Sequence, residues 1–232
     1  MLELENLRTP AHPHCAISLQ LRAGEIVGIA GLVGSGRTEL LQTIFGVTPA
    51  VGGSMRVTGN SFAPANPREA IHAGLALAPE DRKQHGLILQ MAVRENASLA
   101  SLGRDQQNGF LNFKAEEKVA AKAVEQLAIK TPNLDQVTVH LSGGNQQKVV
   151  LGKWLALKPH VLLLDEPTRG IDVGAKREMY RLMEQLAADG VAILFVSSEL
   201  EEVLGMADRA LVMHEGRLAG ELPRDQLSEE AV

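Results

Sequence analysis

An eight-residue glycine-rich segment, Gly31-Leu-Val-Gly-Ser-Gly-Arg-Thr38, constrains the fold more than any other feature of this sequence. The largely apolar residues 25–30 in front of it read as a short buried strand, and residues 37–45 have the pattern of a helix. A strand that enters a glycine-rich turn and leaves it as a helix is the context that the phosphate-binding pattern G-x(4)-G-K-[ST] requires. The segment therefore predicts an α/β fold with a phosphate site at this turn.

Six residues of this segment are expected to contact the ligand. Glycines let backbone N–H groups converge on phosphate oxygens, and the helix N-terminus adds a favourable partial positive charge. Arg37 stands where the pattern expects Lys; it keeps the charge, but its planar fork is bulkier than an ammonium group. Taken alone, the segment also fits an ordinary glycine turn. The expected phosphate contacts are Gly31, Gly34, Ser35, Gly36, Arg37 and Thr38, with the Thr38 hydroxyl on Mg²⁺.

Two carboxylates end an apolar run, Val161-Leu-Leu-Leu-Asp-Glu166. A strand edge beside a phosphate loop is where an acid can hold the hydration shell of Mg²⁺, so we expect Asp165 on the metal side. Glu166 is then the expected general base that orients the attacking water. A solvated turn after a strand is the alternative interpretation, and the phosphate loop elsewhere in the chain makes it the weaker one.

A second glycine pair lies in Leu141-Ser-Gly-Gly-Asn-Gln-Gln-Lys148, at the start of a helix expected to run through Trp154. Ser142 can cap this helix, and Gly143 and Gly144 leave its N-terminus bare, which again suits a phosphate. A plain capped helix is the alternative. Residues from about 84 to 157 have helical patterns throughout, whereas strands and helices alternate on both sides of them. We expect a core lobe of about residues 1–83 and 158–232 and a helical lobe of about 84–157.

Composition narrows the class of protein. The net charge of −5 disfavours nucleic acid as a partner, because phosphate backbones are held mainly by excess Lys and Arg. The longest apolar stretches are much shorter than the roughly 20 residues of a membrane-spanning helix. The single cysteine, Cys15, cannot form an internal disulfide, and no charged-then-apolar leader follows Met1, so we expect a cytoplasmic location.

The order of these motifs resembles that of ATP-binding cassette ATPases, in which Leu-Ser-Gly-Gly-x-x-Gln is followed within about twenty residues by Leu-Leu-Asp-Glu-Pro-Thr. The resemblance implies a phosphate-loop NTPase core with a mixed sheet, an antiparallel β subdomain and a helical subdomain that carries the signature. It also implies that two cassettes meet head to tail, with ATP between the phosphate loop of one and the signature of the other. On this basis ATP also contacts Ser142, Gly143, Gly144, Gln147 and Asp172.

The four longest motifs look like those of the second cassette of tandem ATPases that energise ribose, galactose and xylose import. These are the segments that begin at Gly31, Pro79, Leu141 and Asp165. This closer resemblance implies an ATPase that works with a second cassette, membrane permease subunits and, indirectly, a periplasmic sugar-binding protein. It also implies a peripheral position on the inner face of the cell membrane.

Three residues depart from a standard cassette. Arg37 replaces the phosphate-loop Lys, Glu80 stands at the position of the glutamine-loop Gln, and Ser198 stands at the position of the switch His. No Phe, Tyr or Trp precedes Phe45 to stack on adenine. Glu80, Glu166 and Ser198 remain the expected catalytic positions, while the departures leave open a degenerate module that donates its signature without hydrolysing ATP.

Other conspicuous residues have simpler interpretations. His12, His14 and Cys15 share a proline-bounded loop that lacks a fourth metal ligand, so we interpret them as loop residues. Trp154 and Tyr180 lie on expected helices and are interpreted as packing residues.

Overall fold

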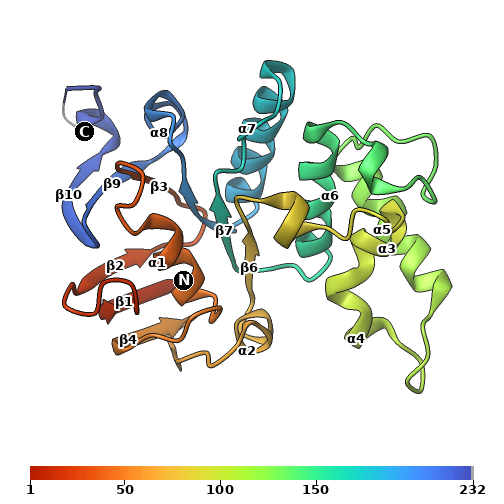
Figure 1. Cartoon of the computed structure of the whole chain (residues 1–232), viewed down its shortest axis with the longest axis horizontal. Coiled ribbons are helices and arrows are strands. Elements are labelled where there is room, and N and C mark those ends of the chain that lie inside the picture. The colour runs from red at the N-terminus through yellow and green to blue at the C-terminus, as the bar shows by residue number, and fades with distance from the viewer. Residues whose placement is uncertain (231–232) are drawn as a thin grey trace. The chain divides into compact units, whose positions relative to one another are not determined.

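The N-terminal part of the chain forms an antiparallel sheet in the order β2-β1-β4-β5 (Figure 1). These strands are β1 Leu2–Arg8, β2 Ile17–Leu21, β4 Gly52–Val57 and β5 Asn60–Phe62. The structure is a computed structural model and describes residues 1–230. Burial alternates strictly along β2, with its three apolar residues inside and its two polar residues outside, as expected for a strand with one face on the core.

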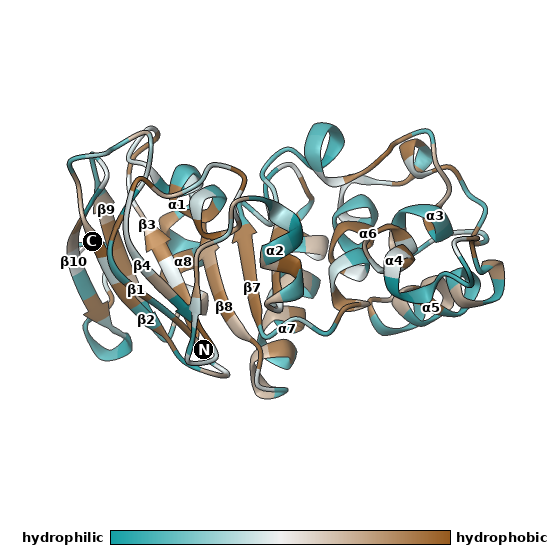
Figure 2. Ribbon diagram, turned by 90° about the horizontal axis from the view of Figure 1, so that it is seen from below, coloured by the Kyte–Doolittle hydropathy of each residue, from teal (hydrophilic) through white to brown (hydrophobic). Residues whose placement is uncertain are grey.

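The larger sheet is mixed and has the order β10-β9-β3-β8-β7-β6. Its strands are β3 Ile26–Ala30, β6 Leu75–Ala78, β7 Val161–Asp165, β8 Ala192–Val196, β9 Arg209–His214 and β10 Arg217–Pro223. Strand β3 runs parallel to β8 and β9, and β7 runs parallel to β8. Every residue of β3, β7 and β8 is buried, and Figure 2 shows these strands as largely hydrophobic, as a sheet covered on both faces requires.

The parallel register brings three loops to one edge of this sheet. Asp165 pairs with Val196, and Val196 pairs with Ile29. The glycine-rich turn after β3, the carboxylates at the end of β7 and the serines after β8 therefore emerge side by side at the carboxyl ends of the strands. Ligands of open α/β sheets bind at such an edge.

Two compact units divide the chain. The first contains residues 1–77, 159–167 and 180–232, and the second contains residues 78–158 and 168–179. Besides both sheets, the first unit holds α1 Arg37–Ile44, α2 Pro67–His72, α8 Leu200–Met206 and the short turn η4 Arg224–Gln226. Helix α7, Val173–Ala188, has residues in both units.

The second unit is helical. It contains α3 Val93–Ser98, η2 Leu99–Ser101, α4 Leu102–Asp105, α5 Phe113–Gln126, η3 Thr138–His140 and α6 Gly143–Leu155. Small residues let α3, α5 and α6 pack closely: Ala97, Ala120 and Ala123 form a buried cluster with Leu134 against it. A Cβ on Gly152 of α6 would lie 3.0 Å from the Cβ of Ala123, so this helix contact depends on the glycine.

The second unit extends beyond the helical lobe of about 84–157 expected from the sequence. It also includes residues 78–83, where a π-helical turn, η1 Arg82–Gly86, follows β6. Residues 168–179 belong to it as well, because the Arg82 guanidinium donates to the carbonyl of Arg169 and Lys148 pairs with Glu178 at 2.7 Å. Trp154 is buried in this unit. None of the helices within residues 1–230 combines the length and the apolar character needed to span a bilayer.

Candidate functional site

The glycine-rich turn has a conformation that fits a phosphate group. Gly31, Gly34 and Gly36 all have positive φ, and a Cβ on Gly31 would lie only 2.3 Å from the carbonyl oxygen of Met213. Gly36 is the N-cap of α1 and offers no side-chain cap, so the first N–H groups of this helix are free of a capping oxygen. The hydroxyl of Ser35 is buried and has no hydrogen-bond partner among residues 1–230. Unsatisfied donors at a helix N-terminus suit an anion such as phosphate.

Thr38 and Asp165 are brought together beside this turn. The Thr38 hydroxyl donates to Oδ1 of Asp165 at 3.2 Å. Burial raises the pKa of the Asp165 carboxyl to about 6, although the hydrogen bond from Thr38 lowers it in part. A hydroxyl and a carboxylate are the oxygen donors that Mg²⁺ prefers. The pair therefore fits the expected metal site.

Glu166 follows Asp165 in a constrained conformation. Its φ is +48°, which is uncommon for a residue with a side chain and is typical of functional positions held by their surroundings. Its backbone N–H donates to the carbonyl of Val196 at 3.0 Å, and its Oε2 accepts from both the backbone N–H and the hydroxyl of Ser198, each at 3.0 Å. Ser198 therefore holds the carboxylate of the expected general base.

A second carboxylate fixes the turn that carries Ser198. Buried Glu202 of α8 accepts from the Ser197 hydroxyl and from the Tyr180 hydroxyl, both at 2.7 Å. Burial, with the hydrogen bond to Glu202, raises the pKa of Tyr180. Tyr180 thus supports the turn after β8 through its hydroxyl in addition to packing.

The side chain of Arg37 points toward the carboxylate of Glu166. Its Nη1 donates to the carbonyl of Ser197 at 2.8 Å, and its Nη2 lies 3.8 Å from Oε1 of Glu166. The side chain is 8% exposed. The charge that replaces the usual lysine is thus engaged with the end of β8 and with Glu166.

His12 joins this site, although the sequence suggested only a loop residue. A Cβ on Gly36 would lie 3.0 Å from Cδ2 of His12, and a Cβ on Gly216 would lie 2.2 Å from its Cγ. The half-buried imidazole therefore packs directly against the backbone at the start of α1 and against the turn between β9 and β10. No local pattern in the sequence marks this contact, because the two glycines lie 24 and 204 residues from His12.

The signature residues lie in the second unit. The Ser142 hydroxyl caps α6, accepting from the side-chain amide of Asn145 at 2.9 Å and from its backbone N–H at 3.5 Å. A Cβ on Gly144 would lie 2.6 Å from the Cβ of Ala175, so close packing explains this glycine. Gln147 is 2% exposed, and its Nε2 lacks a hydrogen-bond partner within the described part of the chain.

Two more expected site residues also belong to the second unit. Glu80 forms an ion pair with Arg169. Asp172 is exposed, and its Oδ1 accepts from the backbone N–H of Ala175 at 2.9 Å, which lowers the pKa of the carboxyl. Asp172 thus caps the first turn of α7. The structure therefore assembles the expected phosphate, metal and base residues in the first unit, and groups the signature with Glu80 and Asp172 in the second.

Known proteins match this chain along most of its length. A family model described as ABC transporter matches residues 15–169. A ribose import ATP-binding protein of Yersinia pestis is 50% identical over 217 residues, which cover 94% of this chain and 43% of the relative. A ribose import ATP-binding protein of Rhodococcus jostii is 50% identical over 232 residues, covering 100% and 46%. A xylose import ATP-binding protein of Photobacterium profundum is 47% identical over 239 residues, covering 100% and 47%.

The chain spans less than half the length of these relatives. Two solved structures share its fold. An ATP-binding cassette of an ABC transporter in its ADP conformation superposes with a TM-score of 0.82 at 22% identity, covering 97% of this chain and 92% of the other. A dimeric cassette bound to ADP and phosphate in a post-hydrolysis state superposes with a TM-score of 0.81 at 21% identity. The match covers 97% of this chain and 99% of the other. With the family model covering well over half of its residues, this chain belongs to the ABC transporter family and has the fold of its ATP-binding cassettes.

Proposed function

We propose that this chain is an ATPase cassette that binds Mg²⁺-ATP and, together with a second cassette, powers the import of a sugar through membrane permease subunits. The observation that carries the proposal is the position of Glu166, whose carboxylate is held by Ser198 beside the Thr38–Asp165 pair. A carboxylate next to a phosphate loop and a metal site is placed to orient water for attack on a phosphoryl group.

The site residues of the first unit have distinct roles in this proposal. Backbone N–H groups of the glycine-rich turn and of α1 bind the phosphates, and Thr38 with Asp165 holds Mg²⁺, which supplies charge neutralisation at the transferred phosphoryl group. Glu166 accepts the proton of the attacking water. Arg37 offers its charge to the phosphates by exchanging its contact with the Ser197 carbonyl for a phosphate oxygen.

The imidazole of His12 offers a surface for the base of the nucleotide. It lies against Gly36, at the start of the helix that binds phosphate, and it is half-buried. Aromatic side chains, including His, stack on unpaired bases. His12 can therefore serve where no Phe, Tyr or Trp precedes Phe45.

The intact signature supports pairing with a second cassette. Ser142 caps α6, and backbone N–H groups at the start of a helix suit an anion. A solved relative with this fold is a dimer bound to ADP and phosphate. Relatives about twice as long as this chain are named ribose and xylose import proteins, which supports a second cassette in the same longer chain, a permease, and indirectly a periplasmic sugar-binding protein.

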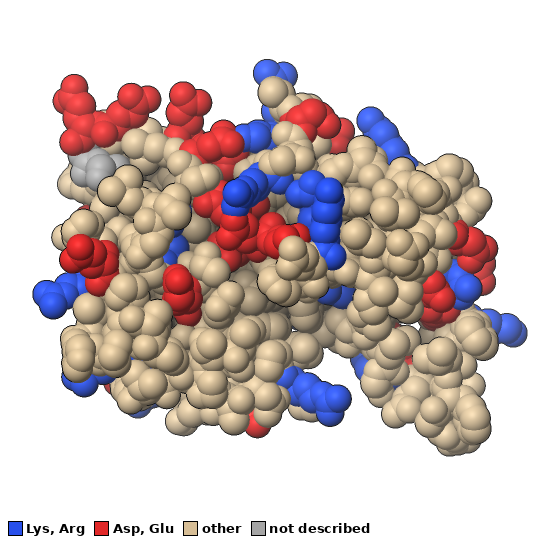
Figure 3. Space-filling model, viewed as in Figure 1, with Lys and Arg blue, Asp and Glu red and all other residues tan. Residues whose placement is uncertain are grey.

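The surface charge supports a protein partner over nucleic acid. Acidic side chains gather over α8 and the C-terminal segment on the face shown in Figure 3. Glu201, Glu229 and Glu230 are exposed there, and the net charge of the chain is −5. Such a surface repels a phosphate backbone.

A permease at the inner face of the cell membrane fits the proposed import function, and we place the chain there as a peripheral subunit.

A complementation experiment tests the proposal. Purified Arg37→Ala has a damaged phosphate loop with an intact signature, and Ser142→Arg has the reverse. Each alone should turn over little ATP. An equal mixture should regain about a quarter of the parental turnover, because half of random pairs are mixed and each mixed pair has one of its two sites complete.

The outcomes separate hydrolysis from binding alone. Recovery in the mixture requires that one chain supplies the loop and another supplies the signature. If the parental chain binds ATP with Mg²⁺ and shows no turnover at any protein concentration, hydrolysis by this chain is wrong and only nucleotide binding remains. If each variant alone keeps parental turnover, the site does not form between two chains.

A further inference from the structure

Arg82 contacts two other segments of the second unit. Its Nη1 donates to the carbonyl of Arg169 at 2.9 Å, and its Nη2 donates to the carbonyl of Gly170 at 3.3 Å. Its Nε lies 3.5 Å from the side-chain oxygen of Gln146 on α6. One guanidinium group thus connects the turn after β6, the signature helix and the loop that leads into α7. None of these contacts has a role in the proposed chemistry described so far.

Gly143 shows how closely these groups approach the signature. A Cβ on Gly143 would lie 2.7 Å from Nη2 of Arg82 and 2.9 Å from the carbonyl oxygen of Gly170. The φ of Gly143 is not positive, so its conformation alone does not require glycine. The first residue of α6 is therefore a glycine because the Arg82 guanidinium and the Gly170 carbonyl occupy the space that a side chain would fill.

The segment that carries Arg82 is itself fixed at both ends. The Asp81 carboxylate accepts from the backbone N–H groups of Lys83 and Gln84, which starts the π-helical turn η1. At the other end, the buried Lys153 of α6 donates to the carbonyl of Gly86 at 2.7 Å. The pair between Glu80 and Arg169 adds a further contact between the same segments. These contacts fix the backbone that carries Arg82, so the guanidinium is directed toward the start of the signature helix.

We propose that Arg82 is a positioning residue that fixes the N-terminus of the signature helix against the Gly170 loop, so that Ser142 and Gly143 present their N–H groups correctly to ATP bound by a second cassette. The role rests on the proposed function, in which this helix N-terminus contacts nucleotide. A planar fork can reach acceptors in three directions at once, whereas the ammonium of a lysine is a point charge that cannot. Arg82→Lys should therefore fail to replace it fully.

Hydrogen exchange of the free chain tests the positioning step without nucleotide or partner. Arg82→Ala should raise the exchange rate of amides in residues 143–146 and 169–175 by at least about tenfold, which corresponds to about 1.4 kcal/mol. Arg82→Lys should give a smaller increase at the same amides. Amides of α3 and α5 should keep their parental rates. Lys83→Ala is the matched control, because Lys83 is the exposed neighbour and its removal changes the charge equally.

Turnover and association test the functional step. In the parental background, Arg82→Ala should lower kcat at least about tenfold and leave the affinity for ATP of the chain's own phosphate loop unchanged, a split that general unfolding would not give. In a Glu166→Gln background, ATP-driven association should weaken in Arg82→Ala and persist in Lys83→Ala.

The outcomes for Arg82 and for the proposed function are distinguishable. Parental exchange rates in residues 143–146 of Arg82→Ala overturn the positioning role, whatever turnover does. Faster exchange with unchanged kcat and unchanged association also overturns it. If two copies of the Glu166→Gln chain do not associate when ATP is added, the proposed head-to-tail pairing is wrong. The exchange rates alone then decide whether Arg82 positions the helix.

Discussion

The two units differ in the contacts that their charged side chains make. In the first unit, Arg37 and Glu166 lie 3.8 Å apart at the site that is proposed to receive phosphate, and the Ser35 hydroxyl there is left without a partner within residues 1–230. In the second unit, the Arg82 guanidinium contacts backbone carbonyls next to the signature. The first arrangement can be rearranged by a ligand, while the second is already complete.

The expected departures from a standard cassette are divided between the units. Arg37 and Ser198 lie in the first unit and both contact Glu166, whereas Glu80 lies in the second. The signature has a glycine at each position where a Cβ would meet a neighbour, so its sequence is limited by packing within the unit. A rearranging site tolerates exchange of one polar group for another, whereas a packed helix N-terminus does not.

The largest effect is expected at Glu166. Glu166→Gln removes the proposed proton acceptor and keeps the shape and the hydrogen bond from Ser198, so turnover should fall by about 10²–10⁴-fold while ATP binding is retained. Turnover and binding of a fluorescent ATP analogue measure the two effects. Glu201→Gln, an exposed change on α8, is the control and should match the parent. Equal turnover in Glu166→Gln would exclude Glu166 as the base.

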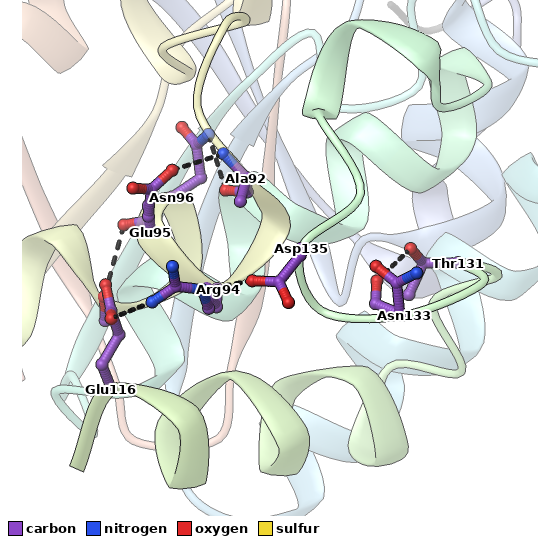
Figure 4. A network of polar contacts seen from close by, with 9 residues as sticks. Ala92, Arg94, Glu95, Asn96, Glu116, Thr131, Asn133 and Asp135 are labelled. Atoms are coloured by element: carbon purple, nitrogen blue, oxygen red, sulfur yellow. Dashed lines mark hydrogen bonds and ion pairs between the residues drawn. The ribbon is translucent and has the colours of Figure 1, made fainter. Parts of the chain in front are cut away.

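The second expected effect is on the stability of the helical unit. Glu116 of α5 is buried and pairs with Arg94 of α3 at 2.7 Å, while Arg94 also pairs with exposed Asp135 at 2.6 Å (Figure 4). Glu116→Gln should lower the free energy of unfolding by about 1–3 kcal/mol, because a buried ion-pair partner is lost. Asp135→Asn breaks a solvent-exposed pair with the same arginine and should cost less than about 1 kcal/mol.

Urea denaturation followed by tryptophan fluorescence measures this difference. Trp154 is the single tryptophan of the chain and is buried in the second unit, so its signal reports on that unit. Equal losses of stability in the two variants would contradict the role assigned to burial.

His12 should contribute to binding of the base and not of the phosphates. His12→Ala should weaken the binding of ATP by about 1–3 kcal/mol, the range for stacking of one base on an aromatic side chain. The binding of inorganic tripolyphosphate should be unchanged. Isothermal titration with both ligands checks the difference. His14→Ala, an exposed change in the same loop, serves as the control. An equal loss for both ligands would mean that His12 acts only by supporting Gly36.

The buried Lys153 gives the second unit a pH dependence. Burial lowers the pKa of its ammonium to about 8, so between that pH and its ordinary value near 10.5 the unfolded chain binds more protons than the folded one. The free energy of unfolding should therefore rise with pH across this window, by up to about 1.4 kcal/mol per pH unit, and be independent of this group below it. Trp154 fluorescence in urea at several pH values measures the slope. Lys153→Met should remove it, and the exposed Lys158→Met should not.

Local sequence was sufficient to predict most of the helices and strands, including those that carry the candidate site residues. The strand, glycine turn and helix around residues 25–45 are marked by neighbouring residues, and β7 is an unbroken apolar run before its carboxylates. Helix α2 was missed although its signal is local: Asn66 caps it and Pro67 occupies its first position. β1 was also missed, although Leu2 and Leu4 alternate with acidic residues as in a half-buried strand.

The partners of the charged residues could not be predicted from the sequence for a physical reason. Arg37 contacts a carbonyl 160 residues away, and Arg82 contacts one 88 residues away. Such contacts depend on how the strands and helices pack, and a pattern within one segment holds no information about them. The sequence predicts which residue types reach the edge of the sheet; only the packed structure determines which partners they meet.

The smallest effect is expected at Ser198. Its size distinguishes a hydroxyl that contacts the phosphoryl group from one that only holds Glu166. The Ser198 hydroxyl and backbone N–H both donate to Oε2 of Glu166, so Ser198→Ala removes one of two bonds and leaves the other. One hydrogen bond of about 0.5–1.5 kcal/mol predicts a loss of turnover of about 2- to 10-fold with unchanged ATP affinity. Steady-state kinetics beside Glu166→Gln give the comparison. A loss as large as that of Glu166→Gln would mean that the hydroxyl contacts the phosphoryl group itself, whereas a small loss assigns Ser198 to holding the base in place.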